Sequence, residues 1–283
     1  MNPMAIAVRQ GWTRGMIELR QALTNGQDLF GILFWPVAML VVLFFMRNAS
    51  FEGSGVLLGS LALPSTIGML VAVNGMIGMG QQLTLDREDG TLLRAKATPN
   101  GMVGYLIGKI VQVSGWVLIP SALLLVGGMF IVDGLALGQV GSWVTLTWVM
   151  VLGLLATLPI GAIFGSVFAD PRNFALMTFP IMALVAVSGI FYPITSMPGW
   201  VQGAAQVFPV YWLGLGMRSA LLPDEAVAIE LGQSWRHLET VGVLGIWAIA
   251  GLLIAPVVLR RMARRESGSS VAVRREKAMQ RAY

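Results

Sequence analysis

Six long apolar segments separated by shorter connections constrain the fold of this chain more than any other feature. Each has 18 to 26 residues, which as a helix spans about 27–39 Å, enough to cross a hydrocarbon core of about 30 Å. None shows the alternation of apolar and polar residues over strand-length segments that is typical of an outer-membrane barrel. We therefore predict an all-α polytopic membrane protein with six transmembrane helices, at residues 29–46, 63–85, 110–132, 143–168, 174–193 and 240–259.

Composition excludes the main soluble classes. The 283 residues are 56% apolar and 12% charged, about half the charged share of an average soluble domain. So few charges could not cover the surface of one or two soluble domains. Because the chain has no cysteine and one histidine, His237, a disulfide framework, a thiolate metal site and a histidine-rich metal site are excluded. We expect no bound metal.

Basic residues indicate the orientation of the spans. Six spans place both termini on one side, and 16 of the 19 lysines and arginines then lie on that side. Only Arg47, Arg218 and Arg236 lie on the other. Basic residues concentrate on the cytoplasmic side of membranes, so we expect a cell (inner or plasma) membrane protein with cytoplasmic termini and a basic cytoplasmic tail at 260–283. The net charge of +5 then indicates basic residues that contact the lipid bilayer, and we expect no nucleic-acid partner.

The N-terminal segment, residues 1–28, has the pattern of an amphipathic helix. Arg14 and Glu18 share a polar face as an i,i+4 pair, and charges interrupt any signal-peptide core before residue 29. We predict a helix lying in the cytoplasmic membrane interface, the alternative being an ordinary start to the first span. Its apolar face consists of Val8, Trp12, Met16, Leu19 and Leu23.

The predicted spans lack the groups that several membrane functions require. They contain no charged residue, whereas proton- or sodium-coupled carriers need an intramembrane ionisable group. Gly104, Gly108 and Lys109 resemble the end of a phosphate-binding loop, but that loop needs Gly at 103 and Ser or Thr at 110. The spacing instead predicts a small-xxx-small helix contact, as at Gly161 and Gly165. We expect no ATPase or other enzyme activity and no cofactor in this chain.

The connection after the second span carries the first resemblance to a known family. Residues 86–99 read DREDGTLLRAKATP, which resembles the E-R-E-x-G-T-L-E-x-L-x-x-T-P signature of type-two ATP-binding-cassette (ABC) exporter permeases. Asp86 replaces the usual Glu, and Leu93 stands where the family often has Glu. The resemblance implies a coupling helix at 84–99 seated on a separate ATPase, with the coupling residues Asp86, Arg87, Glu88, Asp89, Gly90, Thr91, Leu92 and Arg94.

The segment between the fifth and sixth spans carries the second resemblance. Residues 188–222 are similar to the family's S-G-x-x-x-P-x-x-x-x-P-x-W-x-Q block. Prolines and glycine break 194–238 into pieces too short to span, yet it is too apolar for a free loop. We predict short re-entrant helices in the outer leaflet, which the resemblance implies cap the exit; the alternative is an aromatic belt without a gating role.

The end of the predicted fifth span suggests an outer gate. Gly189 permits close approach of a second copy, so the bulky Ile190 and Phe191 could meet across the pair axis, with Pro193 ending the helix. An apolar plug of this kind resists water by dewetting. Candidates for the translocation path are Asn74, Phe179 and Met182.

The residues and the resemblance together predict the permease subunit of an ABC exporter, with 29–259 as its transmembrane domain. The resemblance implies a second permease copy or a paralogue, and a separately encoded ABC ATPase that binds ATP and Mg. A Met-, Leu- and Phe-rich lining without charge favours a hydrophobic or amphiphilic substrate such as a drug, antibiotic or lipid. Export of a polysaccharide or cell-wall polymer, a secondary carrier and a non-transport membrane scaffold remain the alternatives.

Overall fold

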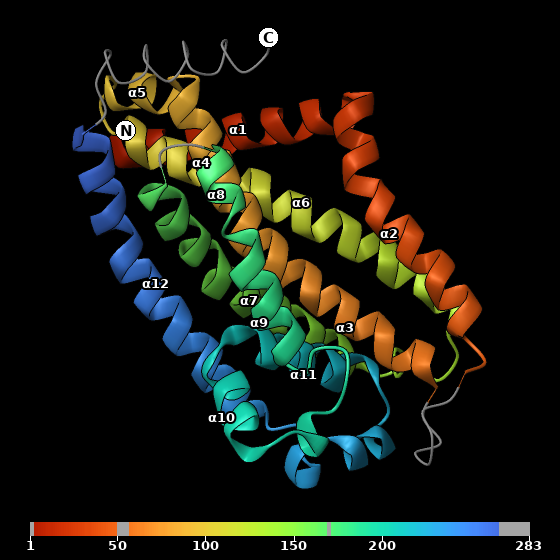
Figure 1. Cartoon of the computed structure of the whole chain (residues 1–283). Helices are drawn as coiled ribbons and strands as arrows, with labels where there is room; N and C mark the ends of the chain where they lie inside the picture. The colour runs from red at the N-terminus through yellow and green to blue at the C-terminus, as the bar shows by residue number, and fades with distance from the viewer. Residues whose placement is uncertain (1–2, 50–56, 169–170, 266–283) are drawn as a thin grey trace.

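The computed structural model describes residues 3–49, 57–168 and 171–265. Within these ranges, five helical runs are long and apolar enough to cross a membrane. The first four runs alternate in direction, whereas α12 runs in the same direction as α7, because the chain returns through α8 and α9 between them (Figure 1). The runs are α2 (Gly26–Met46), α3–η1–α4 (Leu58–Val73, Asn74–Gly78, Met79–Glu88), α6 (Gly101–Ile131), α7 (Val140–Val167) and α12 (His237–Arg265).

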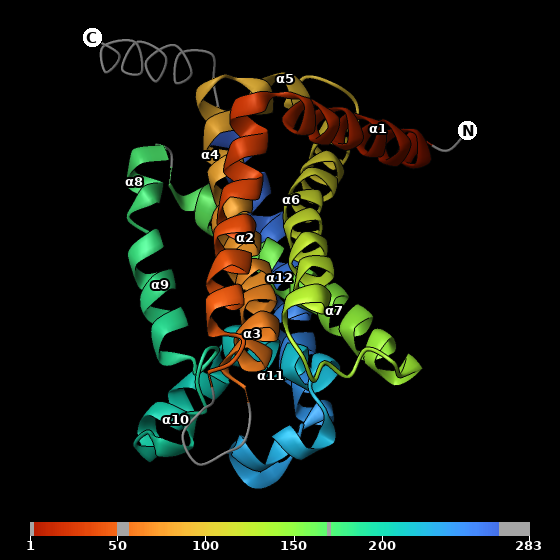
Figure 2. The same cartoon turned by 90° about the vertical axis from the view of Figure 1, so that its right-hand side faces the viewer.

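The predicted fifth span, 174–193, is represented by two short helices. These are α8 (Pro171–Ala175) and α9 (Thr178–Val187), which follow one another along the side of the bundle (Figure 2). The prediction that Pro193 ends this helix is wrong, because α9 ends at Val187. Gly189 has a φ of 67°, a left-handed conformation that turns the chain out of the helix. The described residues therefore contain five long apolar helices and not six.

One end of the bundle, called here the α1 end, carries α1 (Pro3–Thr24) lying across it, together with α5 (Thr91–Lys96) and the end of α12 (Figures 1 and 2). The chain turns from α1 into α2 at Asn25, whose side chain accepts hydrogen bonds from the N–H groups of Gln27 and Asp28. This N-cap satisfies donors that the start of α2 would otherwise leave free.

The opposite end, called here the α10 end, carries the short helices that follow α9. They are η2 (Ile194–Ser196), α10 (Gly199–Val207), α11 (Pro209–Leu221), η3 (Asp224–Ile229) and η4 (Leu231–Gln233). The prediction of short helices between the last two spans thus corresponds to α10 and α11.

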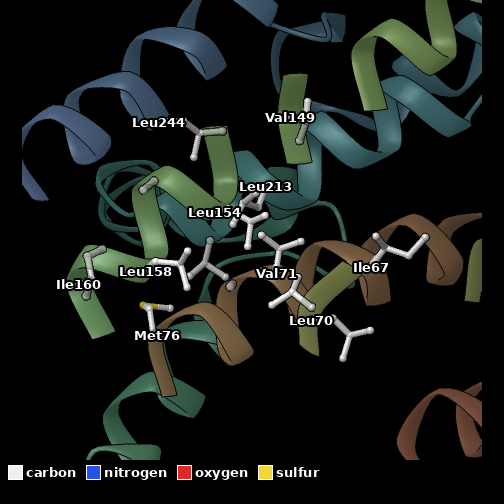
Figure 3. Close-up of a cluster of buried hydrophobic side chains, with 14 of the residues drawn as sticks. Ile67, Leu70, Val71, Met76, Val149, Leu154, Leu158, Ile160, Leu213 and Leu244 are labelled. Atoms are coloured by element: carbon white, nitrogen blue, oxygen red, sulfur yellow. The ribbon is translucent and has the colours of Figure 1, made fainter. Parts of the chain in front are cut away.

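Helix α11 enters the bundle interior, and the hydrophobic core forms around it. All of its 13 residues except Ser219 are buried, and it packs between α3, α7 and α12. Figure 3 shows Val71 of α3, Leu154 of α7 and Leu213 of α11 pointing toward one another, and Leu244 of α12 belongs to the same buried cluster. Burial of these apolar side chains stabilises the arrangement of the four helices around each other.

Glycines let two pairs of helices approach to backbone contact. A Cβ added at Gly11 of α1 would lie 2.3 Å from the carbonyl oxygen of Gly104 in α6. The small-xxx-small contact predicted at Gly104 and Gly108 is therefore confirmed, and its partner is α1. The second predicted contact is also confirmed, since a Cβ at Gly161 would lie 2.4 Å from the carbonyl oxygen of Met76. Larger side chains at these positions would push the helices apart.

The contact with α6 determines which face of α1 is covered. The buried face consists of the small residues Ala7, Gly11, Gly15 and Ala22. On the predicted apolar face, Val8, Trp12 and Met16 are exposed. Their side chains are therefore available to surroundings outside the protomer.

Candidate functional site

The predicted coupling segment at 84–99 forms a tight bend and not one helix. Helix α4 ends at Glu88, Gly90 adopts a left-handed φ of 78°, and α5 begins at Thr91. The Asp89 carboxylate accepts a hydrogen bond of 2.7 Å from the Thr91 N–H, one of the N–H groups that lack a partner within the helix at the start of α5. The bend lies at the α1 end of the bundle, between α4 and α6 (Figure 1).

Burial divides the predicted coupling residues into two groups. Asp89 and Arg94 are exposed and Glu88 is half-buried, so these three side chains lie at the surface of the protomer. The remaining five are buried inside the protomer, so they cannot contact a partner protein directly in this conformation. They are Asp86, Arg87, Gly90, Thr91 and Leu92.

Lys109 lies at the centre of a buried polar network behind this bend. Its side chain is 4% exposed, and its Nζ is 2.9 Å from Asp86 Oδ2 in α4 and 2.8 Å from Glu18 Oε2 in α1. The third donor of the ammonium reaches Gln112 Oε1 at 3.0 Å. All three donors are thus used, which a buried charge requires. One residue of α6 therefore ties α1 to α4.

Two further hydrogen bonds complete the network. The Tyr105 hydroxyl donates to Asp86 Oδ2 at 2.8 Å, and Arg14 Nε lies 2.7 Å from Glu18 Oε1, which confirms the i,i+4 pair. Burial raises the pKa of Glu18, but hydrogen bonds from Lys109 and Arg14 outweigh it, so the pKa lies below its ordinary value. Glu18 therefore stays ionised at neutral pH and remains paired with Lys109.

Arg87 attaches the same bend to α7. Its Nη1 donates to the carbonyl oxygens of Ser166 and Phe168, at 3.1 and 2.9 Å. These carbonyls lie at the C-terminal end of α7, where backbone acceptors lack partners within the helix. A cation there is also favoured by the helix dipole. The buried acid and base before the bend thus hold α4 against α1, α6 and α7.

Sequence reasoning did not identify Lys109 as the centre of this network. The available signal was that Lys109 is the sole charged residue of α6. A lone charge near the end of an apolar helix requires a partner, but its partners lie far away in the sequence. Among the described residues, no group of three His, Asp or Glu side chains gathers as a metal site would require.

The predicted outer-gate residues differ in how far the structure exposes them. Ile190 is 0% exposed, because a turn after α9 packs it against Gly214 of α11. The prediction that its side chain meets a second copy is therefore wrong for this conformation. Phe191 is 42% exposed and Pro193 is half-buried, so of these residues Phe191 is the most accessible from outside the protomer.

The three path candidates lie on two different elements. Asn74 begins the π-helical turn η1 and is half-buried. Phe179 and Met182 lie on α9 with 74% and 37% of their surface exposed. Because η1 packs on α3, α4, α6 and α7 while α9 packs on α10 and α11, the candidates have different surroundings.

Long apolar helices, joined at one end by a charge-anchored bend and closed at the other by short helices, define a multi-pass membrane protein. The model of the family described as ABC-2 family transporter protein matches residues 49–257. The chain therefore belongs to the ABC-2 transporter family, as a permease subunit, which confirms the resemblance of residues 86–99 and 188–222.

Two curated relatives are similar to this chain. One is a protein of Escherichia coli K12 named "Probable multidrug ABC transporter permease YbhR", 23% identical over 189 residues, which are 66% of this chain and 50% of the relative. Its namesake from Escherichia coli O157:H7 matches to the same extent. The chain thus spans about half the length of the curated relatives that it matches.

Proposed function

We propose that this chain is the permease of an ATP-driven exporter for a hydrophobic or amphiphilic small molecule, such as a drug, antibiotic or lipid. The observation that carries the proposal is the bend between α4 and α5, because buried charges hold it rigidly to α1, α6 and α7. A rigid, exposed bend of this kind can transmit a push from another protein into the bundle. Family membership supports the same role.

The energy source in this proposal is a separate ABC ATPase that binds ATP and Mg and docks at the α1 end. Of the predicted coupling residues, Glu88, Asp89 and Arg94 are those whose side chains can reach it. Basic residues of α1, α5 and α12 gather at this end, which supports a cytoplasmic location. There the exposed Trp12 and its apolar neighbours on α1 would enter the membrane interface.

The exposed surface supports an apolar substrate. Phe30 and Trp35 of α2 and Phe179 of α9 each expose about two thirds or more of their side-chain surface, and Phe34 of α2 is also exposed. Two copies, or one copy and a paralogue, would enclose a path between such faces, with Asn74 and Met182 as further candidates and Phe191 at the outer exit. The Escherichia coli relatives are named as probable multidrug ABC transporter permeases, which supports the same substrate class.

Reconstitution tests this function. The chain is co-purified with the ABC ATPase proposed as its partner and incorporated into proteoliposomes, and movement of an amphiphilic fluorescent dye is measured with and without ATP. The matched control is the same complex with the phosphate-loop lysine of the ATPase changed to alanine. We expect transport that requires ATP hydrolysis. Transport that follows a proton gradient at constant ATP would identify a carrier, and failure to bind the ATPase would contradict the proposal.

A further inference from the structure

A buried ion pair at the α10 end has no part in the function proposed so far. Arg218 of α11 and Glu230, between η3 and η4, have side chains that are 3% and 2% exposed. The guanidinium Nε lies 2.6 Å from Glu230 Oε1, and Nη2 lies 3.3 Å from Oε2. This two-pronged geometry is the strong form of an arginine–carboxylate pair. Because both charges are buried, separating them would leave each without compensation.

The same guanidinium also holds a turn that belongs to a different part of the chain. Nη1 donates to the backbone carbonyl of Ile190 at 2.8 Å and lies 3.4 Å from Ser65 Oγ of α3. Ile190 belongs to residues 188–193, called here the outer turn, which connect α9 to η2. Arg218 therefore joins α11, α3, the η3–η4 segment and the outer turn at one point.

The outer turn is held by local hydrogen bonds to α9 and by contacts of Ile190 with α11. Gly189 has a φ of 67°, and Ser188 and Tyr192 donate hydrogen bonds to the carbonyls of Val185 and Ala186 in α9. These bonds are local and would move with α9. The bond from Arg218 instead crosses to α11, against which the Ile190 side chain is completely buried while Phe191 stays exposed.

We propose that Arg218 is a positioning residue that holds the outer turn closed against α11, and that opening of the exit releases the Ile190 carbonyl from Arg218 while the pair with Glu230 persists. A carbonyl released to water exchanges one hydrogen bond for another, whereas separation of the buried charges has no such replacement. The turn is thus the part that can move, and the ion pair is its fixed support. The inference rests on the proposed export function and adds the residue that sets its outer gate.

Thiol labelling tests the movement, since the chain has no cysteine. Ile190→Cys is introduced, the complex is reconstituted with its ATPase, and a membrane-impermeant maleimide is added on the α10 side. We expect the thiol at position 190 to be protected without ATP and to react at least about tenfold faster during turnover, as a buried site does when a local opening exposes it. Protection that persists in complexes actively transporting dye would overturn the proposed movement.

Two matched positions calibrate the labelling. Leu213→Cys in α11 introduces a thiol at a site that is also 0% exposed, and it should stay protected with and without ATP. Phe191→Cys lies in the outer turn at a site that is 42% exposed, and it should react in both conditions. Faster labelling at 213 to the same degree as at 190 would indicate general loosening and would also contradict the proposal.

Arg218 itself is tested in the Ile190→Cys background. Arg218→Lys keeps a charge beside Glu230 but loses the planar fork, and we expect the thiol at 190 to react without ATP. The double variant Arg218→Met/Glu230→Gln leaves no buried charge unpaired, so it keeps the assay usable if the lysine variant does not fold. A merely structural role predicts that every folded variant keeps wild-type protection without ATP, which would overturn the assignment.

The readouts separate this inference from the proposed function. Dye transport and labelling are measured on the same proteoliposomes. Transport with ATP but without exposure at position 190 contradicts the gate alone. Absence of any ATP-dependent transport contradicts the proposed function, and the comparison of Arg218 variants without ATP still decides whether Arg218 holds the turn.

Discussion

Lys109 Nζ lies 2.9 Å from Asp86 Oδ2, which connects the first third of α6 to the end of α4. Asp86 is three residues before the exposed Asp89 of the bend. A force applied to the bend therefore meets a buried ion pair within one helical turn. Lys109 Nζ also lies 2.8 Å from Glu18 Oε2, so a displacement of α4 would act on α1 as well as on α6.

The first prediction concerns removal of this lysine. Lys109→Met leaves the carboxylates of Asp86 and Glu18 buried without their shared cation, and we expect a loss of about 3–5 kcal/mol in the free energy of unfolding. Denaturant unfolding in detergent, followed by tryptophan fluorescence, measures it. The exposed Arg20 on α1 supplies the matched control, Arg20→Met, which should change stability by less than about 0.5 kcal/mol.

A companion variant separates charge from packing. Adding Asp86→Asn and Glu18→Gln to Lys109→Met removes the uncompensated charges and should recover more than half of the lost stability. If the triple variant is no more stable than the single one, the network does not act through its charges.

The second prediction concerns the exposed side of the bend. Glu88→Lys reverses a half-buried charge where the ATPase is proposed to dock, and an unpaired interfacial charge costs about 2–5 kcal/mol. We expect substrate to stimulate ATP hydrolysis less while the permease still inserts and folds. Glu225→Lys is an identical change at an exposed position of the α10 end, and it should leave stimulation unchanged. Wild-type stimulation in the Glu88 variant would remove Glu88 from the coupling role.

The third prediction concerns the glycine contact between α1 and α6. Gly11→Leu adds a side chain whose Cβ would lie 2.3 Å from the Gly104 carbonyl oxygen, and overpacking of this kind typically costs about 1–3 kcal/mol. Gly31→Leu is the control, since a Cβ at Gly31 of α2 meets nothing within 4 Å. Thermal unfolding in detergent compares the two. Equal melting temperatures would show that α1 does not depend on this contact.

Local patterns in the sequence predicted part of this architecture. The four-residue spacing of Gly104 and Gly108 was sufficient to predict a close helix contact, because small residues on one helix face allow a neighbour to approach. The i,i+4 spacing of Arg14 and Glu18 was likewise sufficient for their ion pair. Neither pattern identified the partner of Lys109, because that depends on how distant helices meet.

The α10 end was harder to predict for a physical reason. The apolar run 174–193 has the composition of a full span, but the helix is interrupted between α8 and α9, and the positive φ of Gly189 turns the chain away just after α9. Ile190 then becomes part of the core because α11 enters the bundle beside it. Hydrophobicity alone does not distinguish a side chain that faces a second copy from one that packs against a re-entering helix of its own chain.

The fourth prediction tests whether α1 and α6 move together during transport. A Cβ at position 115 of α6 would lie 3.1 Å from Cγ of Leu19 in α1, and a cysteine sulfur at position 19 takes about the place of that Cγ. Leu19→Cys with Gly115→Cys should therefore form a disulfide on mild oxidation, since the two Cβ atoms fall near the required separation of about 3.5–4.5 Å.

Because Lys109 and the glycine contact already hold α1 to α6, the cross-link should add no constraint to the transport cycle. We expect ATP-dependent dye transport to be equal in oxidised and reduced proteoliposomes, with each single-cysteine variant as the control for the oxidant. Cross-linking is checked by the proteolytic fragments that remain joined without reductant. Transport that stops on oxidation and returns with reductant would show that α1 slides on α6 in each cycle, and the Lys109 network would then be a contact that breaks and re-forms and not a permanent tie.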